Sequence, residues 1–143
     1  MSSGRPQGRG RWLERRVVGG GKALSAPRPL IKLRKLCLAL PEAHEVLAWG
    51  EPTFRVRNKM FATFANGATH HGNGRHAAWC KATLDNQALM VAADPGRFFK
   101  PPYVGPSGWV GVYLDRKVDW AELAEILRDG YRLVAPKRLL DRA

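Results

Sequence analysis

The chain has 143 residues, which leaves room for one ordinary domain and no second core, because domains of about 100 to 150 residues are the commonest size. The 45% hydrophobic fraction and five tryptophans suffice for a packed interior without disulfides or a structural metal. The sequence lacks a secretory apolar core and any run of about 20 apolar residues, which predicts a cytoplasmic protein with no membrane partner.

The net charge of +12 is concentrated near the N-terminus. Residues 1–36 carry ten basic residues against Glu14 alone, whereas residues 37–143 carry 14 basic and 11 acidic residues. Such a basic segment attracts polyanions by electrostatic steering and counterion release, with little sequence preference. A solvated tail that only improves solubility explains the charge equally well.

Glycine, serine, proline and arginine dominate residues 1–29, which predicts a basic, disordered arm before a single domain over residues 30–143. The domain begins with a helix, because its apolar residues recur at helical spacing and basic residues occupy the other side. The apolar positions are Leu30, Leu33, Cys37 and Leu40, and the basic ones are Lys32, Arg34 and Lys35. Pro41 stops this helix.

The rest of the domain is predicted to be an antiparallel meander with two further helices, an α+β fold with about five strands. The expected strands cover residues 45–49, 53–57, 60–65, 76–84 and 109–114. Asp85 can cap a short middle helix that runs to about Ala92. An irregular crossing rich in proline and glycine follows over residues 101–108.

The last helix has the clearest signals. Asp119 and Glu122 have the spacing of a capping box. An apolar stripe follows, made of Trp120, Leu123, Ala124, Leu127 and Tyr131. Gly130 interrupts the helix at a cost of about 1 kcal/mol relative to alanine, which suggests close packing against the sheet.

No catalytic or metal-binding set is evident. Ser107 is the only serine in the domain body and lacks a nucleophile-elbow context, and the carboxylates of the last helix have the spacing of caps and surface charge. The cluster of His70, His71, His76 and Cys80 matches no zinc spacing, and Cys80 is better explained, like Cys37, as a buried free thiol. The sequence therefore predicts a protein that is not an enzyme and has no metal or cofactor.

Basic residues interleaved with aromatic ones are the better functional signal. In the second strand Phe54 and Val56 point to one side while Arg55 and Arg57 point to the other, and a tight Asn58-Lys59 connection closes a hairpin with a cationic outer side. Lys81 shares a strand face with Trp79, and Lys100 follows Phe98-Phe99. Such a surface can hold phosphates while rings stack on bases. The alternative is an ordinary solvent-exposed face over core aromatic rings.

Several separate segments resemble the MmcQ/YjbR family, in the same order, over about residues 30–140. They are Gly50-Glu51-Pro52-Thr53-Phe54-Arg55-Val56, Lys59-Met60-Phe61-Ala62, Pro101-Pro102-Tyr103-Val104-Gly105, Gly108-Trp109-Val110 and Tyr131-Arg132-Leu133-Val134-Ala135-Pro136-Lys137. The resemblance implies an antiparallel sheet with helices packed on it, likened to the CyaY and secretion-chaperone folds and to a "double wing" DNA-binding arrangement. It implies no established reaction, cofactor or catalytic residue.

Two functional hypotheses follow. The first is sequence-tolerant DNA binding, in which the arm assists a set of phosphate contacts. These contacts are Arg55, Arg57, Lys59, Lys32, Lys35, Lys81 and Lys100. The second is a protein-interaction or small-ligand module with an aromatic groove near the proline-rich crossing. The residues expected to line that groove are Trp49, Phe54, Tyr103 and Trp109.

Overall fold

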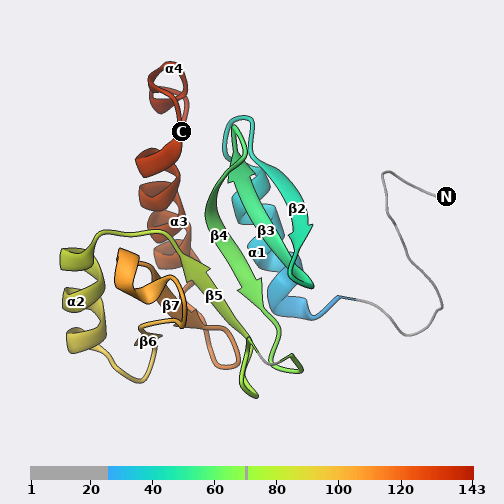
Figure 1. Cartoon of the computed structure of the whole chain (residues 1–143), viewed down its shortest axis with the longest axis vertical. Helices are drawn as coiled ribbons and strands as arrows, with labels where there is room; N and C mark the ends of the chain where they lie inside the picture. The colour runs from blue at the N-terminus through green and yellow to red at the C-terminus, as the bar shows by residue number, and fades with distance from the viewer. Residues whose placement is uncertain (1–25, 70) are drawn as a thin grey trace, which may run out of the picture.

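The computed structural model of the protein describes residues 26–69 and 71–143, so most of the expected arm lies outside the described residues. In the described part, one antiparallel sheet of six strands in the order β2-β3-β4-β5-β7-β6 is combined with four α-helices (Figure 1). The predicted α+β class is therefore confirmed. The sequence predicted about five strands, one fewer than the described residues form.

Strands that follow one another in the sequence are neighbours in the sheet, except that β7 pairs with β5 and β6 lies outside β7 at one edge. The strands are β2 His44–Ala48, β3 Glu51–Val56, β4 Lys59–Ala65, β5 Ala77–Cys80, β6 Phe98–Phe99 and β7 Val110–Tyr113. The helices are α1 Arg28–Leu38, α2 Leu84–Ala93, α3 Trp120–Val134 and α4 Lys137–Leu140, with a short 3-10 turn, η1, at Gly105–Ser107.

Both hairpins at the β2 end of the sheet close through two-residue turns. Trp49-Gly50 connects β2 to β3, and Arg57-Asn58 connects β3 to β4. All four residues have positive φ, between 51° and 78°, which is the conformation of a type I′ turn. Arg57 is therefore the first turn residue rather than the last strand residue that the sequence predicted.

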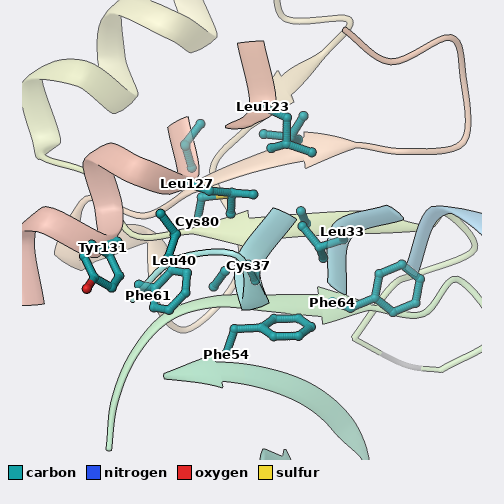
Figure 2. Packing of buried hydrophobic residues seen from close by; sticks show 14 of the residues in the cluster. Leu33, Cys37, Leu40, Phe54, Phe61, Phe64, Cys80, Leu123, Leu127 and Tyr131 are labelled. Atoms are coloured by element: carbon teal, nitrogen blue, oxygen red, sulfur yellow. The ribbon is translucent and has the colours of Figure 1, made fainter. Parts of the chain in front are cut away.

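One face of the sheet is covered by α1 and α3 and holds the main core (Figure 2). Phe54 and Phe61 from the strands meet Leu33 from α1 and Leu127 from α3, and all four side chains are fully or almost fully buried. We call this side of the sheet the helix-covered face. The alternation expected in β3 is correct, since Phe54 and Val56 are buried while Arg55 is partly exposed.

The C-terminal helix α3 is fixed at both ends as the sequence predicted. The Asp119 side chain accepts a hydrogen bond from the Glu122 backbone N–H at 3.0 Å and caps the helix. Near the other end, a Cβ added to Gly130 would lie 2.5 Å from the carbonyl oxygen of Lys81. Only a residue without a side chain lets α3 approach the sheet this closely. The Tyr131 hydroxyl then donates to the Pro41 carbonyl oxygen at 2.7 Å.

Three local expectations are corrected. The cap of α2 is Thr83, whose hydroxyl accepts from the Asn86 N–H, and not Asp85, which lies in the first turn. Strand β5 ends at Cys80, four residues before the expected end, because the chain turns there into α2. Strand β6 was not predicted, since two aromatic residues after a turn carry no strand periodicity.

Candidate functional site

The register of the sheet aligns a row of residues across the face opposite α1 and α3, which we call the open face. Thr53 lies opposite Thr63, Thr63 opposite Trp79, and Trp79 opposite Gly111. The Phe99 ring lies over Gly111, where a side chain would collide with it. Directly opposed residues of antiparallel strands project to the same face. Small residues therefore occupy the β3–β4 part of this row, and aromatic rings occupy the part nearer β6.

A cavity of about 340 Å³ opens on this face above the small residues. Its floor includes Thr53, Thr63 and Ala65. Both threonine hydroxyls donate to backbone carbonyl oxygens, Thr53 to Val46 at 2.6 Å and Thr63 to Pro52 at 2.8 Å. The floor is therefore short and its hydroxyl groups are already satisfied. The apolar walls include Trp49, Met60, Trp79, Tyr103 and Val104.

Two of these wall residues, Trp49 and Tyr103, combine large exposure with an unfavourable backbone conformation. The two residues are 75% and 71% exposed. Their φ angles are 52° and 68°, in the left-handed region that bulky residues rarely adopt. Such strain is typically found at binding and active sites, where selection for function outweighs its cost.

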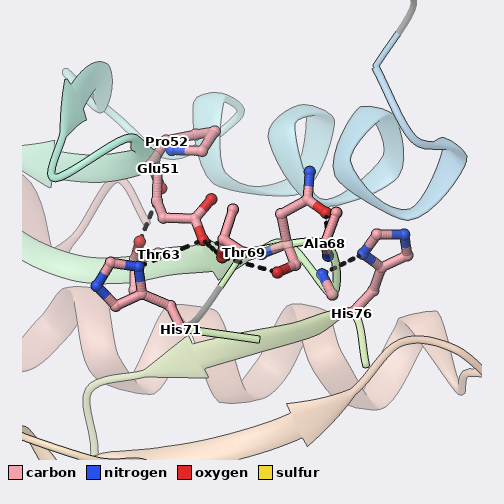
Figure 3. A network of polar contacts seen from close by, with 9 residues as sticks. Glu51, Pro52, Thr63, Ala68, Thr69, His71 and His76 are labelled. Carbon is pink, nitrogen blue, oxygen red and sulfur yellow. Dashed lines mark hydrogen bonds and ion pairs between the residues drawn. The ribbon is translucent and has the colours of Figure 1, made fainter. Parts of the chain in front are cut away.

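The polar part of the cavity is built around Glu51, the first residue of β3 (Figure 3). This residue is only 6% exposed. Its Oε2 accepts a hydrogen bond from the Thr69 hydroxyl at 2.7 Å and from the Asn66 backbone N–H at 3.1 Å. His71 Nδ1 lies 3.7 Å from the same oxygen. The loop between β4 and β5 is thus anchored to a buried carboxylate at the cavity edge.

His71 also links the aromatic residues of the cavity. Its ring makes edge contacts with Trp79 and with Tyr103, at 6.3 Å between centroids in each case. A second cavity of about 370 Å³ adjoins the first and shares Ala65, His71, Trp79 and Tyr103 with it. The second cavity is lined in part by Arg75, whose guanidinium forms an ion pair with Asp115 at 2.7 Å.

Of the four aromatic residues expected to line a groove, the structure places two in the cavity wall and two elsewhere. Trp49 and Tyr103 lie in the wall of the cavity. Phe54 does not, because it projects into the core of the helix-covered face. Trp109 does not either: it is buried in a small cluster with Trp79, and Lys81 lies over its ring at 6.0 Å. The expectation is therefore corrected for Phe54 and Trp109.

Sequence reasoning missed most of the cavity lining. The most important of the missed residues are Glu51, His71 and Trp79. No local pattern marked Glu51 as buried, because glutamate is mostly exposed in folded proteins. His71 was considered only as a metal ligand. The pairing of Trp79 with Thr63 depends on strand register, which no local pattern encodes.

The seven basic residues proposed to contact phosphates belong to different elements. Lys32 and Lys35 are exposed on α1, Arg57 and Lys59 are exposed at the β3–β4 hairpin, and Lys100 is exposed after β6. Arg55 donates to the Thr53 hydroxyl at 3.0 Å and to Asn58 at 3.3 Å, and Lys32 lies over the Trp120 ring at 5.3 Å. None of the seven forms an ion pair within the described residues.

A further group of cations surrounds Glu42 near the hairpin tip. Arg138 binds this carboxylate through two hydrogen bonds of 2.8 and 3.0 Å. The hydrogen bond from Arg138, together with the charges of Arg138, Arg142 and Arg57, lowers the pKa of Glu42. Arg57 therefore lies near the C-terminal arginines, an arrangement that the sequence did not reveal because about 80 residues separate them.

The two cysteines are buried free thiols, as predicted. Burial raises the pKa of Cys80 to about 12 and that of Cys37 well above its usual value, so neither is a ready nucleophile at neutral pH.

Within residues 26–69 and 71–143, no three side chains of histidine, cysteine, aspartate or glutamate are grouped as metal ligands, and His70 lies outside that range. The helices of the same region include none that is long and apolar enough to cross a membrane.

Comparisons with known proteins bear on the fold and the family. The crystal structure of the Deinococcus radiodurans protein DR2400, which carries a DUF419 domain, has a similar fold with a TM-score of 0.64. The similarity covers 79% of this chain and 86% of that one, at 22% sequence identity. None of the curated proteins compared with the chain matches it. The model of the YjbR family matches residues 38–133, which is more than half of the sequence, and the chain therefore belongs to the YjbR family.

Proposed function

We propose that this domain is a non-enzymatic module that binds a small molecule in the cavity on the open face. The observation that carries the proposal is the cavity itself, about 340 Å³ with apolar and aromatic walls and one buried carboxylate. Small-molecule sites are typically clefts of about 300 to 1,000 Å³ with mostly apolar walls and a few placed polar groups. The cavity fits this description in volume and in composition.

The conformation of the wall residues supports the same proposal. Trp49 occupies the first central position of a type I′ turn, where asparagine, aspartate or glycine is favoured. A largely exposed tryptophan gains little stability in that position, and its positive φ costs about 1 kcal/mol or more. A ligand that packs against the ring accounts for its presence.

The composition of the cavity favours binding over catalysis. The described residues of the lining include no serine, cysteine or lysine, and the hydroxyl groups of Thr53 and Thr63 are engaged with backbone carbonyl oxygens. A nucleophile would need a neighbouring base within hydrogen-bond reach. The neighbouring titratable groups of the lining, Glu51 and His71, hold the loop between β4 and β5 in place.

A cavity-filling variant tests the proposal. Ala48 is partly exposed on edge strand β2 and lines the cavity, so Ala48→Phe places a ring inside it. Leu47→Phe is the matched control, because Leu47 is 65% exposed and projects to the opposite face. A thermal-shift screen of small molecules should give hits that stabilise the native chain and the control but lose their effect in Ala48→Phe. Hits that act equally on all three proteins would contradict a site in this cavity.

Duplex DNA binding is the second candidate, and it is favoured because its seven proposed contacts have no ion-pair partner among the residues that the structure describes. Unpaired cations remain available for phosphate groups, whereas paired ones must first lose a carboxylate. The hairpin tip would be the centre of this surface, since Arg57 lies near Arg138 and Arg142. The double-wing arrangement remains a prediction from the family resemblance.

Fluorescence anisotropy with a labelled duplex in rising salt tests this second candidate. We expect Arg55→Glu/Arg57→Glu to weaken binding at low salt and to make the salt slope shallower by about 0.9 for each lost phosphate contact. Arg116→Glu/Lys117→Glu is the matched control with the same change in net charge, at exposed positions between β7 and α3. A chain that starts at Ala26 measures the contribution of the arm. Equal losses in both double variants would remove the hairpin from this role.

A further inference from the structure

We infer that the cavity on the open face selects a small organic cation, a protonated amine attached to an apolar or aromatic body. This inference rests on the proposed function, since it names the class of ligand for the same cavity. It is carried by the buried Glu51 carboxylate and by the aromatic rings that share the cavity with it.

Donors among the described residues engage only one oxygen of the Glu51 carboxylate. Its side chain is 8% exposed. Oε2 accepts hydrogen bonds from Thr69 and Asn66, whereas Oε1 accepts none from the residues that the structure describes. No lysine or arginine of the same region forms an ion pair with it. A buried carboxylate is costly unless a positive charge and hydrogen-bond donors compensate it, and an ammonium group supplies both.

His71 leaves one oxygen of the carboxylate open to such a ligand. Its Nδ1 is 3.7 Å from Oε2 of Glu51, an ion-pair distance when the imidazole is protonated but longer than a hydrogen bond. It also approaches the oxygen that Thr69 and Asn66 already use, so the other oxygen remains available to a donor. The edge contacts of its ring with Trp79 and Tyr103 hold it at the boundary between the two cavities.

The aromatic walls favour a cation for an independent reason. Trp49, Trp79 and Tyr103 line the same cavity as Glu51. The face of an aromatic ring carries partial negative charge and attracts a cation, most strongly for tryptophan, and the attraction grows when water is excluded. The same rings bind the apolar body of an amine by ordinary burial.

The distribution of basic residues argues against an anionic ligand. The chain has 24 lysines and arginines, yet none of those within residues 26–69 and 71–143 lines this cavity. Sites for phosphates or carboxylates normally present arginine, lysine or backbone N–H groups to the anion. The neighbouring cavity does contain Arg75, but Asp115 holds that guanidinium through two hydrogen bonds of 2.7 and 2.8 Å. The cavity therefore has the opposite electrostatic character from the chain as a whole.

Isothermal titration calorimetry of the full chain with three matched probes tests the inference. The probes are 2-phenylethylamine, 2-phenylethanol and phenylacetate, which share an aromatic body and are cationic, neutral and anionic at neutral pH. We expect the amine to bind about tenfold or more tightly than the alcohol, and the acid to bind most weakly. Binding of the alcohol or the acid as tight as that of the amine would overturn the inference, as would no binding of the amine.

A charge-removing variant assigns the selectivity to one residue. Glu51→Gln keeps the shape of the side chain and an acceptor for Thr69, so we expect the amine to bind this variant as weakly as the alcohol binds the native chain. The matched control Glu42→Gln removes an exposed carboxylate and should leave all three affinities unchanged. Undiminished binding of the amine to Glu51→Gln would refute the role of the carboxylate. Thermal unfolding checks that the variant is folded, and the three-probe comparison on the native chain is decisive without it.

The failure of this inference can be told apart from the failure of the proposed function. If the alcohol binds as tightly as the amine and Ala48→Phe abolishes both, the cavity binds ligands without charge selectivity and only the inference falls. If Ala48→Phe changes the binding of no probe and of no screening hit, the cavity is not the binding site. Both proposals then fall together.

Discussion

The two faces of the sheet use the same strands for different purposes. On the helix-covered face, Phe54, Phe61 and Leu127 fill the space between strands and helices and are fully or almost fully buried. On the open face the opposed residues Thr53 and Thr63 are short, and a cavity of about 340 Å³ remains above them. One face is packed for stability. The other face has an unfilled cavity, exposed aromatic rings and a buried carboxylate, and each of these lowers stability.

Because successive side chains of a strand point to opposite faces, the same strand can supply core residues on one face and cavity residues on the other. Phe54 and Thr53 are neighbours in the sequence, yet one belongs to the core and the other to the cavity floor. Substitutions on the helix-covered face should therefore act on the free energy of unfolding. Those on the open face should act mainly on ligand binding.

The largest effect is expected from Phe54→Ala. The fully buried ring leaves a cavity in the main core, and we expect the free energy of unfolding to fall by about 3–5 kcal/mol. Thr53→Ala, one residue away on the open face, is the control. It should cost clearly less, because it removes one hydrogen-bonded hydroxyl and a methyl group rather than a buried aromatic ring. Urea unfolding monitored by circular dichroism measures both. Similar losses in the two variants would break the contrast between the faces.

Gly130→Ala should also destabilise the protein, although alanine is the better helix former. Helix propensity alone predicts a gain of about 1 kcal/mol. The new Cβ would lie 2.5 Å from the Lys81 carbonyl oxygen and push α3 off the sheet, at a cost of about 1–3 kcal/mol. Gly96→Ala is the control, because its Cβ would meet neighbours at ordinary distances of 3.5 Å. A higher urea midpoint for Gly130→Ala would show that α3 is not held as closely as described.

Alkaline pH should weaken the helix-covered face through Cys80. Its pKa is raised from 9.0 to about 12 in the folded chain, so between these values the unfolded state ionises first. The stabilising contribution is complete below pH 9 and is lost as the pH rises, by about 1.4 kcal/mol per pH unit for this group. Unfolding curves from pH 8 to 10.5 should therefore fall less steeply with pH in Cys80→Ala. Identical slopes in the native chain and the variant would contradict burial of the thiol.

The smallest effect has the opposite sign. Trp49→Asn creates an Asn-Gly pair, the favoured sequence for a type I′ turn, and should raise the free energy of unfolding by about 0.5–1 kcal/mol while weakening ligand binding. Arg57→Asn is the matched control at the second turn, and it should stabilise the chain without affecting the cavity. Differential scanning calorimetry with and without a ligand separates the two outcomes. A loss of stability in Trp49→Asn would mean that the ring supports the fold.

Local patterns in the sequence were sufficient for the main helices, for most of the strands and for the alternation within β3, but not for β6 or for the end of β5. The Asp119 cap, the apolar stripe of α3 and the alternation around Phe54 are all encoded within a few residues. The cavity is not encoded in this way. It depends on the register that brings Thr63 opposite Trp79 and on the loop that returns His71 to Glu51, and both are long-range pairings. The sequence named Trp49, Phe54, Tyr103 and Trp109 together, and no local pattern distinguished the two rings in the cavity wall from the two that are buried elsewhere.

The most direct test of the central claim, that ligands occupy the open face, is an NMR titration of the chain labelled at its methionine methyl groups. Met60 lines the cavity, whereas Met90 on α2 packs beside the core of the helix-covered face. Addition of 2-phenylethylamine, or of a hit from the thermal-shift screen, should shift the Met60 signal in a saturable manner and leave the Met90 signal in place. A ligand that binds and shifts Met90 but not Met60 would contradict the account.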